Sequence, residues 1–241
     1  MDELQMRYSR QIGVVSQEGQ DRLVNAKVLI AGAGGLGSVT ATYLALAGVG
    51  TIRIVDRDRV EATNLNRQFL HYEEDLGRRK TDSAGEKLRR WNSGIRIEAL
   101  TGTIDESTLG DFADGMDLIV DAADSFPLRR LLNRAALERN IPFIHGAVRG
   151  FYGQAMTVLP FRSACFTCLF PSQSESGPPP VLGATCGVIG AVQTSEAIKA
   201  LTGQGALLAG RLLLWDGMNA SMDTIAIERT PSCPACGHRS P

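Results

Sequence analysis

Residues 27–37 read KVLIAGAGGLG, and the fold can be inferred outward from this stretch. Positions 27–32 form a short, apolar, β-rich run that ends in glycine, which is typical of a buried strand. Gly32, Gly34 and Gly37 give the pattern G-x-G-x-x-G, and a predicted helix at 38–47 follows. Such glycines let the backbone approach phosphate oxygens, and a helix start supplies N–H donors. The stretch predicts a phosphate-binding loop, with a purely structural turn as the alternative.

An acidic residue follows at the place where a nucleotide-binding unit needs one. Asp56 ends a second predicted strand at 51–56, about 20 residues beyond the last glycine. A carboxylate at this position can accept hydrogen bonds from both ribose hydroxyls. Together with the glycines, it favours nucleotide binding over a structural turn. It does not identify the nucleotide, and NAD is the usual partner of such a pattern.

Strands and helices alternate along the rest of the first 150 residues. This alternation predicts an α/β fold, a doubly wound, Rossmann-like and mostly parallel sheet with helices on both faces. After Gly150 the pattern indicates an antiparallel C-terminal extension. The predicted strands are 96–100, 116–121, 142–147, 154–159, 211–216 and 224–228, and the predicted helices are 80–91, 127–139 (closed by Asn140) and 190–201.

We expect a single domain over residues 1–241. Its predicted parts are a helical segment at 1–25, a nucleotide-binding half at 26–150 and a C-terminal part at 151–241. The polar, proline-rich stretch at about 170–183 is expected to be a mobile loop.

Composition and charge exclude several classes of protein. Hydrophobic residues make up 44% of the chain, enough for a sizeable core, and the net charge of -1 argues against a nucleic-acid partner. No apolar run approaches the roughly 20 residues of a membrane span, and the first residues lack the apolar part of a secretory signal. We therefore expect a cytoplasmic protein without a membrane partner.

The loop after Asp56 carries an unusual group of hydrogen-bond donors. Asn64, Asn66, Arg67 and Gln68 lie within five positions, and Lys80 begins the next predicted helix. Two cations and several neutral donors suit a triphosphate better than the bridging pyrophosphate of NAD. The alternative is that the amides cap turns and the arginine is simply exposed.

Four of the five cysteines form two C-x-x-C pairs. Four thiolates are enough for a closed tetrahedral zinc site, and in a cytosolic chain this is favoured over disulfides. Because the pairs are far apart in the sequence, the fold must bring them together, so that zinc would fasten the C-terminal tail. The predicted ligands are Cys165, Cys168, Cys233 and Cys236.

Several motifs together resemble one family, the bacterial ubiquitin-activating-like adenylyltransferases of the HesA/MoeB/ThiF type, which serve molybdopterin and thiamine biosynthesis. The resemblance covers nearly the whole chain. Its motifs are RYSRQI at 7–12, GAGGLGS at 32–38, the D-x-D of Asp56 and Asp58, NLNRQFL at 64–70, Lys80, DAADS at 121–125, GVIGAVQTSEAIK at 187–199 and the paired C-x-x-C sequences.

The resemblance implies ATP and Mg²⁺ as well as zinc. Asp56 would hold the ribose, and Asn64, Arg67 and Lys80 would contact phosphates. Asp124 would hold magnesium, although an aspartate before Pro127 could instead cap a helix. The implied catalytic residues are Arg10, Arg67, Lys80 and Asp124, and the implied nucleotide-binding residues are Gly32, Gly34, Gly35, Gly37, Asp56, Asp58, Asn64, Asn66, Gln68 and Lys80.

The resemblance also implies partners. The substrate would be a small ubiquitin-fold sulfur-carrier protein that ends in Gly-Gly, with a sulfur donor acting afterwards. Arg10 would come from the second subunit of a homodimer. The product would be an acyl adenylate of the carrier, with release of pyrophosphate.

Two cysteine questions remain open at the level of the sequence. Cys186 could be a buried packing residue or a nucleophile that receives the acyl group, and we favour packing. Some members of the family use a cysteine in the loop just upstream. This chain has serine near that place, at Ser176, which argues against a covalent thioester or acyl-disulfide step.

Three other functions also stay open. An NAD-dependent oxidoreductase can have the same fold, and so can a binding protein that has lost catalysis. A third alternative is a relative that adenylates a tRNA base or a peptide instead of a carrier protein.

Overall fold

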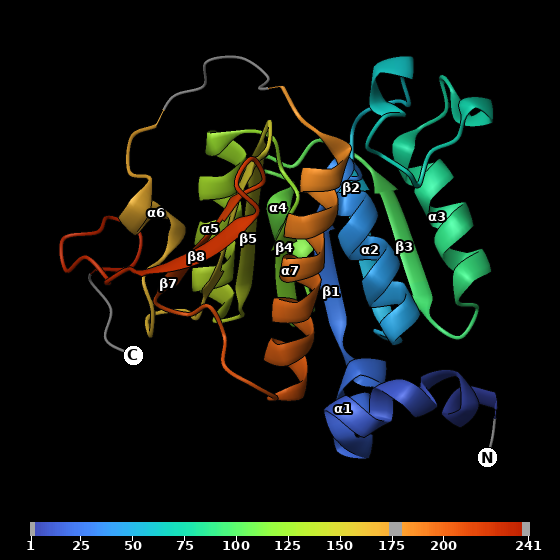
Figure 1. Cartoon of the computed structure of the whole chain (residues 1–241), viewed down its shortest axis with the longest axis horizontal. Coiled ribbons are helices and arrows are strands. Elements are labelled where there is room, and N and C mark those ends of the chain that lie inside the picture. Colours follow the sequence, from blue (N-terminus) through green and yellow to red (C-terminus); the bar gives the residue numbers. More distant parts are fainter. Residues whose placement is uncertain (1–2, 174–179, 238–241) are drawn as a thin grey trace.

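The computed structural model describes residues 3–173 and 180–237 (Figure 1). Its elements are α1 (Glu3–Asn25), β1 (Lys27–Ala31), α2 (Gly35–Ala47), β2 (Thr51–Asp56), η1 (Ala62–Asn64), η2 (Glu73–Asp75), α3 (Lys80–Trp91), β3 (Arg96–Thr101), α4 (Leu109–Ala113), β4 (Leu118–Asp121), α5 (Phe126–Arg139), β5 (Phe143–Arg149), β6 (Tyr152–Val158), α6 (Phe166–Leu169), α7 (Gly183–Thr202), β7 (Arg211–Asp216) and β8 (Ser221–Ala226).

An eight-stranded sheet has the order β3-β2-β1-β4-β5-β6-β7-β8. Strands β1 to β5 pair in parallel, and β6, β7 and β8 extend the sheet in antiparallel pairs. This confirms the predicted fold class. Because the chain leaves β1 toward β2 on one side and continues from β4 toward β5 on the other, the sheet has its switch point between β1 and β4. Ligands of doubly wound folds bind beyond the carboxyl ends of the strands at this point.

Helices cover both faces of the sheet. One buried cluster joins α2, α3 and α7 to one face, and another joins α4, α5 and the paired cysteines to the opposite face. Strands covered on both faces are apolar throughout, which explains the continuous run of β1 and the fully buried β4. None of the helices in the described ranges combines the length and the apolar character needed to cross a membrane.

The glycine loop is shorter than predicted, since α2 begins at Gly35 and not at Ser38. A Cβ on Gly37 would lie 2.0 Å from the carbonyl oxygen of Gly32. Gly32 itself has a φ of 116°, and a Cβ there would lie 2.6 Å from the carbonyl oxygen of Ala122. Any side chain at these two positions would displace backbone, so the loop needs glycine for its own packing as well as for phosphate access.

Helix α7 is longer than the predicted 190–201, because it begins at Gly183. Its glycines are contact points and not breaks. A Cβ on Gly183 would lie 2.6 Å from the carbonyl oxygen of Asn66, and one on Gly190 would lie 2.5 Å from the Cβ of Val39 in α2. The predicted mobile loop at about 170–183 therefore ends where α7 starts, and its part at 174–179 lies outside the described residues.

Several strand bounds also need correction. β4 begins at Leu118 and not at Met116, and β5 covers Phe143–Arg149 instead of 142–147. β6 covers Tyr152–Val158 instead of 154–159, and β8 covers Ser221–Ala226 instead of 224–228. β8 is the edge strand of the sheet and is mostly exposed, so its residue types do not indicate where it pairs with β7.

Helix α1 lies at the end of the sheet where the strands begin (Figure 1). Its Gln11 and Gln20 side chains donate hydrogen bonds to the carbonyl oxygen of Ala47, the last residue of α2. The glycine loop stands before the first residue of α2, at the opposite end of the helix. α1 is therefore remote from the phosphate loop of its own chain.

Candidate active site

The glycine loop and the acidic end of β2 are joined directly. The N–H of Ala33 donates to Asp56 Oδ2 at 2.8 Å, and the N–H of Asp58 donates to Asp56 Oδ1 at 2.7 Å. Asp56, the residue predicted to bind the ribose, therefore lies beside the glycine loop, at the carboxyl end of the neighbouring strand β2. Each carboxylate oxygen retains a lone pair for a ribose hydroxyl.

The start of α2 is suited to an anion. Its N-cap, Gly34, offers no side chain, and the first turn carries no acidic residue. The positive end of the helix dipole and its N–H groups are thus left for a ligand.

Two cations border this loop. Lys80, at the start of α3, is buried and places Nζ 3.1 Å from Asp58 Oδ2. The Arg67 side chain passes 3.6 Å from the position that a Cβ on Gly35 would take. Its Nη1 donates to the carbonyl oxygen of Thr63 and to Asn66 Oδ1. Arg67 therefore borders the glycine loop directly, and Lys80 is linked to it through Asp58 and Asp56, an arrangement of charge that suits a polyphosphate.

The amides of the NLNRQ loop differ in their surroundings. Asn64 is buried, and its Oδ1 accepts from the N–H of Glu61, so this side chain caps its own turn. Gln68 is also buried, and its Oε1 has no hydrogen-bond partner in the described structure, while its Nε2 faces Gly34. Asn66 is exposed and orients Arg67. Asn64 is thus committed to the loop, whereas Gln68 retains an unused acceptor next to the phosphate loop.

Asp124 lies beyond the end of β4 with its side chain exposed. The capping interpretation is wrong, because Ser125 is the N-cap of α5 and accepts from the N–H of Leu128. The Asp124 carboxylate makes no hydrogen bond or ion pair with any residue in the described ranges. It follows Ala122, which touches Gly32, so a free carboxylate borders the glycine loop at the switch point of the sheet.

A buried polar cluster under this loop was not predicted. Asp121 is fully buried; it accepts from His145 Nδ1 at 2.6 Å and from the N–H of Ala123, and lies 3.4 Å from Arg129 Nε. Burial lowers the pKa of His145 against the opposing effect of Asp121. The neutral ring accepts from Gln154 through Nε2, as expected for a satisfied core histidine. The sequence signal was present in DAADS, whose first aspartate ends a fully apolar strand and needs a partner.

Arg10 is not brought to this site by its own chain. It is exposed on α1, at the end of the sheet where the strands begin. Arg67 lies against Gly35, Lys80 pairs with Asp58 after β2, and Asp124 follows β4, so the other three predicted catalytic residues stand at the carboxyl edge of the sheet.

Cys186 is buried in the first turns of α7. Its Sγ lies 2.7 Å from the position of a Cβ on Gly35, so it fills the space that this glycine leaves. Burial raises the pKa of its thiol, although Arg67 acts in the opposite direction. These surroundings suit packing more than nucleophilic attack. Ser176 lies outside the described residues.

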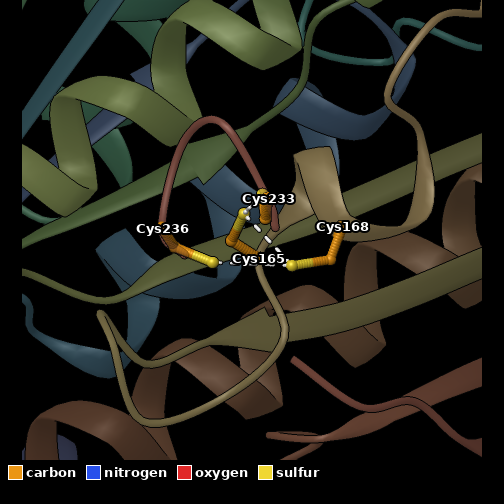
Figure 2. A group of neighbouring side chains, drawn as sticks. All are labelled: Cys165, Cys168, Cys233 and Cys236. Atoms are coloured by element: carbon orange, nitrogen blue, oxygen red, sulfur yellow. Dashed lines mark hydrogen bonds between the residues drawn. The ribbon is translucent and has the colours of Figure 1, made fainter. Parts of the chain in front are cut away.

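The four paired cysteines converge on one point (Figure 2). All four Sγ atoms lie within 4.8 Å of one another. The measured separations are 3.8 Å for Cys165–Cys168, 3.7 Å for Cys165–Cys233 and 3.5 Å for Cys168–Cys236. Four sulfurs bound tetrahedrally to zinc at about 2.3 Å lie about 3.8 Å apart, so the cluster has the geometry of a four-cysteine metal site.

The thiols of this cluster differ in acidity. Burial raises the pKa of Cys165 and, together with a hydrogen bond to Cys168, that of Cys236 to about 11. Burial also opposes ionisation of Cys168, but hydrogen bonds from the backbone N–H groups of Thr230 and Cys165 and from neighbouring thiols lower its pKa to about 7.

A doubly wound sheet with a glycine loop, a ribose-positioned carboxylate and flanking cations at its switch point defines a nucleotide-binding α/β enzyme. The model of the ThiF family matches residues 8–235, and the chain belongs to this family. It is accordingly an adenylyltransferase, as are relatives that it matches over most of their length.

Two relatives and one solved structure illustrate the match. The chain is 41% identical over 239 residues to the SAMP-activating enzyme E1 of Haloferax volcanii, covering 96% of this chain and 88% of the relative. It is 39% identical over 244 residues to the sulfur carrier protein adenylyltransferase of Thermus thermophilus, covering 96% and 90%. The crystal structure of Escherichia coli MccB with ATP superposes with a TM-score of 0.87 at 27% identity, covering 96% of this chain and 75% of that one.

Proposed function

We propose that this adenylyltransferase activates the C-terminal Gly-Gly carboxylate of a small ubiquitin-fold sulfur-carrier protein. The observation that carries the proposal is the arrangement around the glycine loop, where Arg67 and Lys80 flank the phosphate site and the free carboxylate of Asp124 borders it. The name of the Thermus thermophilus relative, a sulfur carrier protein adenylyltransferase, supports this choice of substrate.

The reaction needs positioning and charge more than acid–base groups. A carboxylate oxygen of the carrier attacks the α-phosphorus of ATP, the bond from that phosphorus to the bridging oxygen breaks, and pyrophosphate leaves. The nucleophile is already ionised, so no general base is required. Arg67 and Lys80 stabilise the charge that gathers on the phosphates.

Asp124 would supply a carboxylate oxygen to magnesium. Its side chain is exposed and has no partner in the described part of the chain, which fits a metal ligand better than a structural role. A bound magnesium ion would neutralise part of the phosphate charge.

A homodimer would complete the site. Since α1 lies at the far end of its own sheet, Arg10 can act on the γ-phosphate side only if it comes from another copy of the chain. We therefore assign Arg10 to the partner's site, in line with the family resemblance.

The antiparallel strands offer a surface for the carrier. Tyr152, Leu214 and Ile225 lie on the same face of β6, β7 and β8, because Tyr152 pairs with Asp216, two residues from Leu214, and Leu214 pairs with Asp223, two residues from Ile225. They are 54%, 38% and 48% exposed. Exposed apolar side chains on one face can contribute to a protein interface. A carrier on this face could extend its Gly-Gly tail toward the glycine loop, and the acyl adenylate would later react with a sulfur donor, with AMP leaving.

Zinc would occupy the four-cysteine cluster. The sulfur separations fit tetrahedral coordination, and four protein ligands leave no open position, so the role would be structural.

Exchange of labelled pyrophosphate into ATP tests the proposed reaction. The expected result is exchange that requires Mg²⁺ and one Gly-Gly-ending carrier, and that disappears when the carrier's terminal carboxylate is amidated. Exchange with a peptide or a tRNA but with no carrier would contradict the choice of substrate. Absence of ATP binding, together with tight NADH binding, would contradict adenylation.

A further inference from the structure

A second buried polar cluster lies beneath the glycine loop. It packs beside α3, whereas Asp121 ends β4 on the other side of β1. Its members are His71, Asp75, Ser83 and Lys87, all of them buried. Ser83 and Lys87 share the face of α3 that also carries Lys80, since the spacings are three and four residues. Neither the proposed reaction nor the predicted site uses this cluster.

His71 connects the cluster to the glycine loop. Its Nε2 lies 3.0 Å from the carbonyl oxygen of Ala33, and its Nδ1 lies 2.9 Å from Ser83 Oγ. A carbonyl oxygen can only accept, so Nε2 must carry the ring hydrogen. Nδ1 of the neutral ring is then an acceptor for the Ser83 hydroxyl. Burial, the largest effect, lowers the pKa of His71 and favours this neutral form.

Lys87 fixes the direction of the Ser83 hydroxyl. Its ammonium donates to Ser83 Oγ at 2.9 Å and also pairs with the buried carboxylate of Asp75. Because the serine oxygen accepts from Lys87, its own hydrogen is available to another acceptor, and His71 Nδ1 at 2.9 Å is nearer than the carbonyl oxygen of Leu70 at 3.4 Å. A hydrogen bond from Ser83 to Nδ1 favours the tautomer that aims Nε2–H at Ala33.

The geometry of the peptide group carries this effect to the ligand side. The peptide between Ala33 and Gly34 is trans, so its C=O and N–H point in opposite directions. Holding the Ala33 C=O against His71 turns the Gly34 N–H away from the protein interior. That N–H forms no hydrogen bond with any residue in the ranges 3–173 and 180–237. The preceding N–H, of Ala33, is held by Asp56.

We propose that His71 is a positioning residue for the nucleotide: it fixes the Ala33–Gly34 peptide so that the Gly34 N–H points at the phosphates of ATP. This inference rests on the proposed function, since it places ATP in the glycine loop. Asp75, Lys87 and Ser83 act through His71 and do not touch the ligand.

Two substitutions of His71 separate donation to Ala33 from simple space filling. In His71→Gln the amide nitrogen can take the place of Nε2 and donate to Ala33. In His71→Asn the shorter amide reaches only the place of Nδ1, beside Ser83. Both variants remove the buried ring and replace it with a neutral amide, so they serve as matched controls for each other.

The measurements are ATP affinity with Mg²⁺ in the absence of carrier, KM and kcat for pyrophosphate exchange, and the melting temperature. We expect His71→Asn to bind ATP about tenfold more weakly than the wild type, with the KM for ATP raised in parallel. Its kcat should stay within about twofold of the wild type, because the Gly34 N–H contacts the phosphates both before and during the reaction. His71→Gln should keep ATP affinity within about threefold. Equal ATP affinity in the two variants, or a lowered kcat with KM unchanged, would overturn the proposal.

A milder variant and the wild type complete the test. Ser83→Ala keeps the ring but removes the group that selects its tautomer, and it should raise KM for ATP by about threefold. If neither His71 variant folds, an unchanged KM in Ser83→Ala would overturn the proposal. Failure of the wild type to bind ATP would contradict the proposed function instead.

Discussion

Two aspartates three positions apart differ completely in their surroundings. Asp121 is fully buried among His145, Arg129 and the N–H of Ala123, while Asp124 is exposed and its carboxylate makes no hydrogen bond or ion pair with a described residue. The first carboxylate holds the loop, and the second is available to a cation. Chemistry at the residue scale is therefore set by environment and not by residue type.

These two aspartates should respond differently to the same substitution. Asp124→Asn should leave the melting temperature within about 1 °C, since a surface change costs under about 0.5 kcal/mol, yet it should raise the Mg²⁺ concentration needed for pyrophosphate exchange. Asp121→Asn should destabilise the fold by about 3 kcal/mol, because Arg129 is left buried without its counter-charge. Magnesium titration and thermal unfolding of both variants check this. A normal magnesium requirement in Asp124→Asn would remove that residue from the metal site.

At this scale the sequence predicted which residues meet near the glycine loop, but not the residues that support them. The glycines, Asp56, Arg67 and Lys80 stand in motifs whose spacing carries their meaning, and the structure places them around one loop. His71 stands in an irregular segment, Asp75 ends the short helix η2 and His145 lies inside the buried strand β5, and in none of these places does a periodic pattern indicate which side chains will meet. Their partners come from elements distant in the chain and are visible only in the fold.

Between residue and molecule, elements are held together by a few specific contacts. The segment η2 is fastened to α3 by Asp75, which pairs with Lys87 and with Arg78. Burial by itself would raise the pKa of Asp75, but hydrogen bonds from Lys87 and from the N–H of Tyr72, together with the charge of Lys87, lower it to about 2. The carboxylate is thus more acidic in the folded protein than in the unfolded chain.

Acid should therefore loosen this attachment. A group whose folded pKa is depressed stabilises the protein above its unfolded value, near 4, and this contribution is lost as the pH falls from about 4 to about 2. We expect the free energy of unfolding of the wild type to fall more steeply over this interval than that of Asp75→Asn, which is less stable at pH 7. Chemical denaturation at several pH values measures both. Parallel pH profiles would contradict the assigned pKa.

Close packing of two helices gives a second test at the scale of elements. A Cβ on Gly190 of α7 would lie 2.5 Å from the Cβ of Val39 in α2, whereas one on Gly187 would meet no atom within 4 Å. Gly190→Ala should destabilise the protein by about 1–3 kcal/mol through overpacking. Gly187→Ala, in the same helix, should stabilise it by about 0.5–1 kcal/mol, because alanine is the better helix former. Denaturant titration of both variants measures the two changes in the free energy of unfolding. If the two changes had the same sign, the packing argument would be contradicted.

Element boundaries were predictable where a chemical signal marks them. The start of α3 at Lys80 and the end of α5 at Asn140, whose φ is 53°, match the prediction. The start of α7 was missed because glycines normally interrupt helices, and only the closeness of α2 and the NLNRQ loop explains them. β8 was misplaced because both of its faces are largely exposed, so no alternation of apolar and polar residues indicates its register.

At the scale of the whole molecule, the cysteine cluster connects the two ends of the C-terminal part. Cys165 and Cys168 precede α7, β7 and β8, and Cys233 and Cys236 follow them. A bound metal would therefore close a long loop and fasten the end of the described chain to α5 and β5, whose buried residues share a cluster with these cysteines. Closing such a loop stabilises a protein mainly by reducing the conformational entropy of the unfolded chain.

Removal of metal should lower stability substantially. We expect chelation, or Cys168→Ser, to lower the melting temperature by roughly 10 °C, which corresponds to about 3–4 kcal/mol for a domain of this size. Cys186→Ser is the matched control, since it changes a buried cysteine outside the cluster and should leave the metal content unchanged. Elemental analysis and thermal unfolding check this. Purified wild-type protein without bound metal, or Cys168→Ser with full metal content, would contradict the assignment.

The same cluster fixes an order of events during synthesis. Cys165 and Cys168 leave the ribosome first, but the metal site is incomplete until translation has passed Cys236. Strands β7 and β8 are therefore complete before the fastening that holds the segment after them can form. A chain truncated shortly before Cys233 would contain every residue of the proposed active site. It would lack two of the four metal ligands, so the metal could not fasten its C-terminal part. In a cell short of the metal, full-length chains would share this unfastened state.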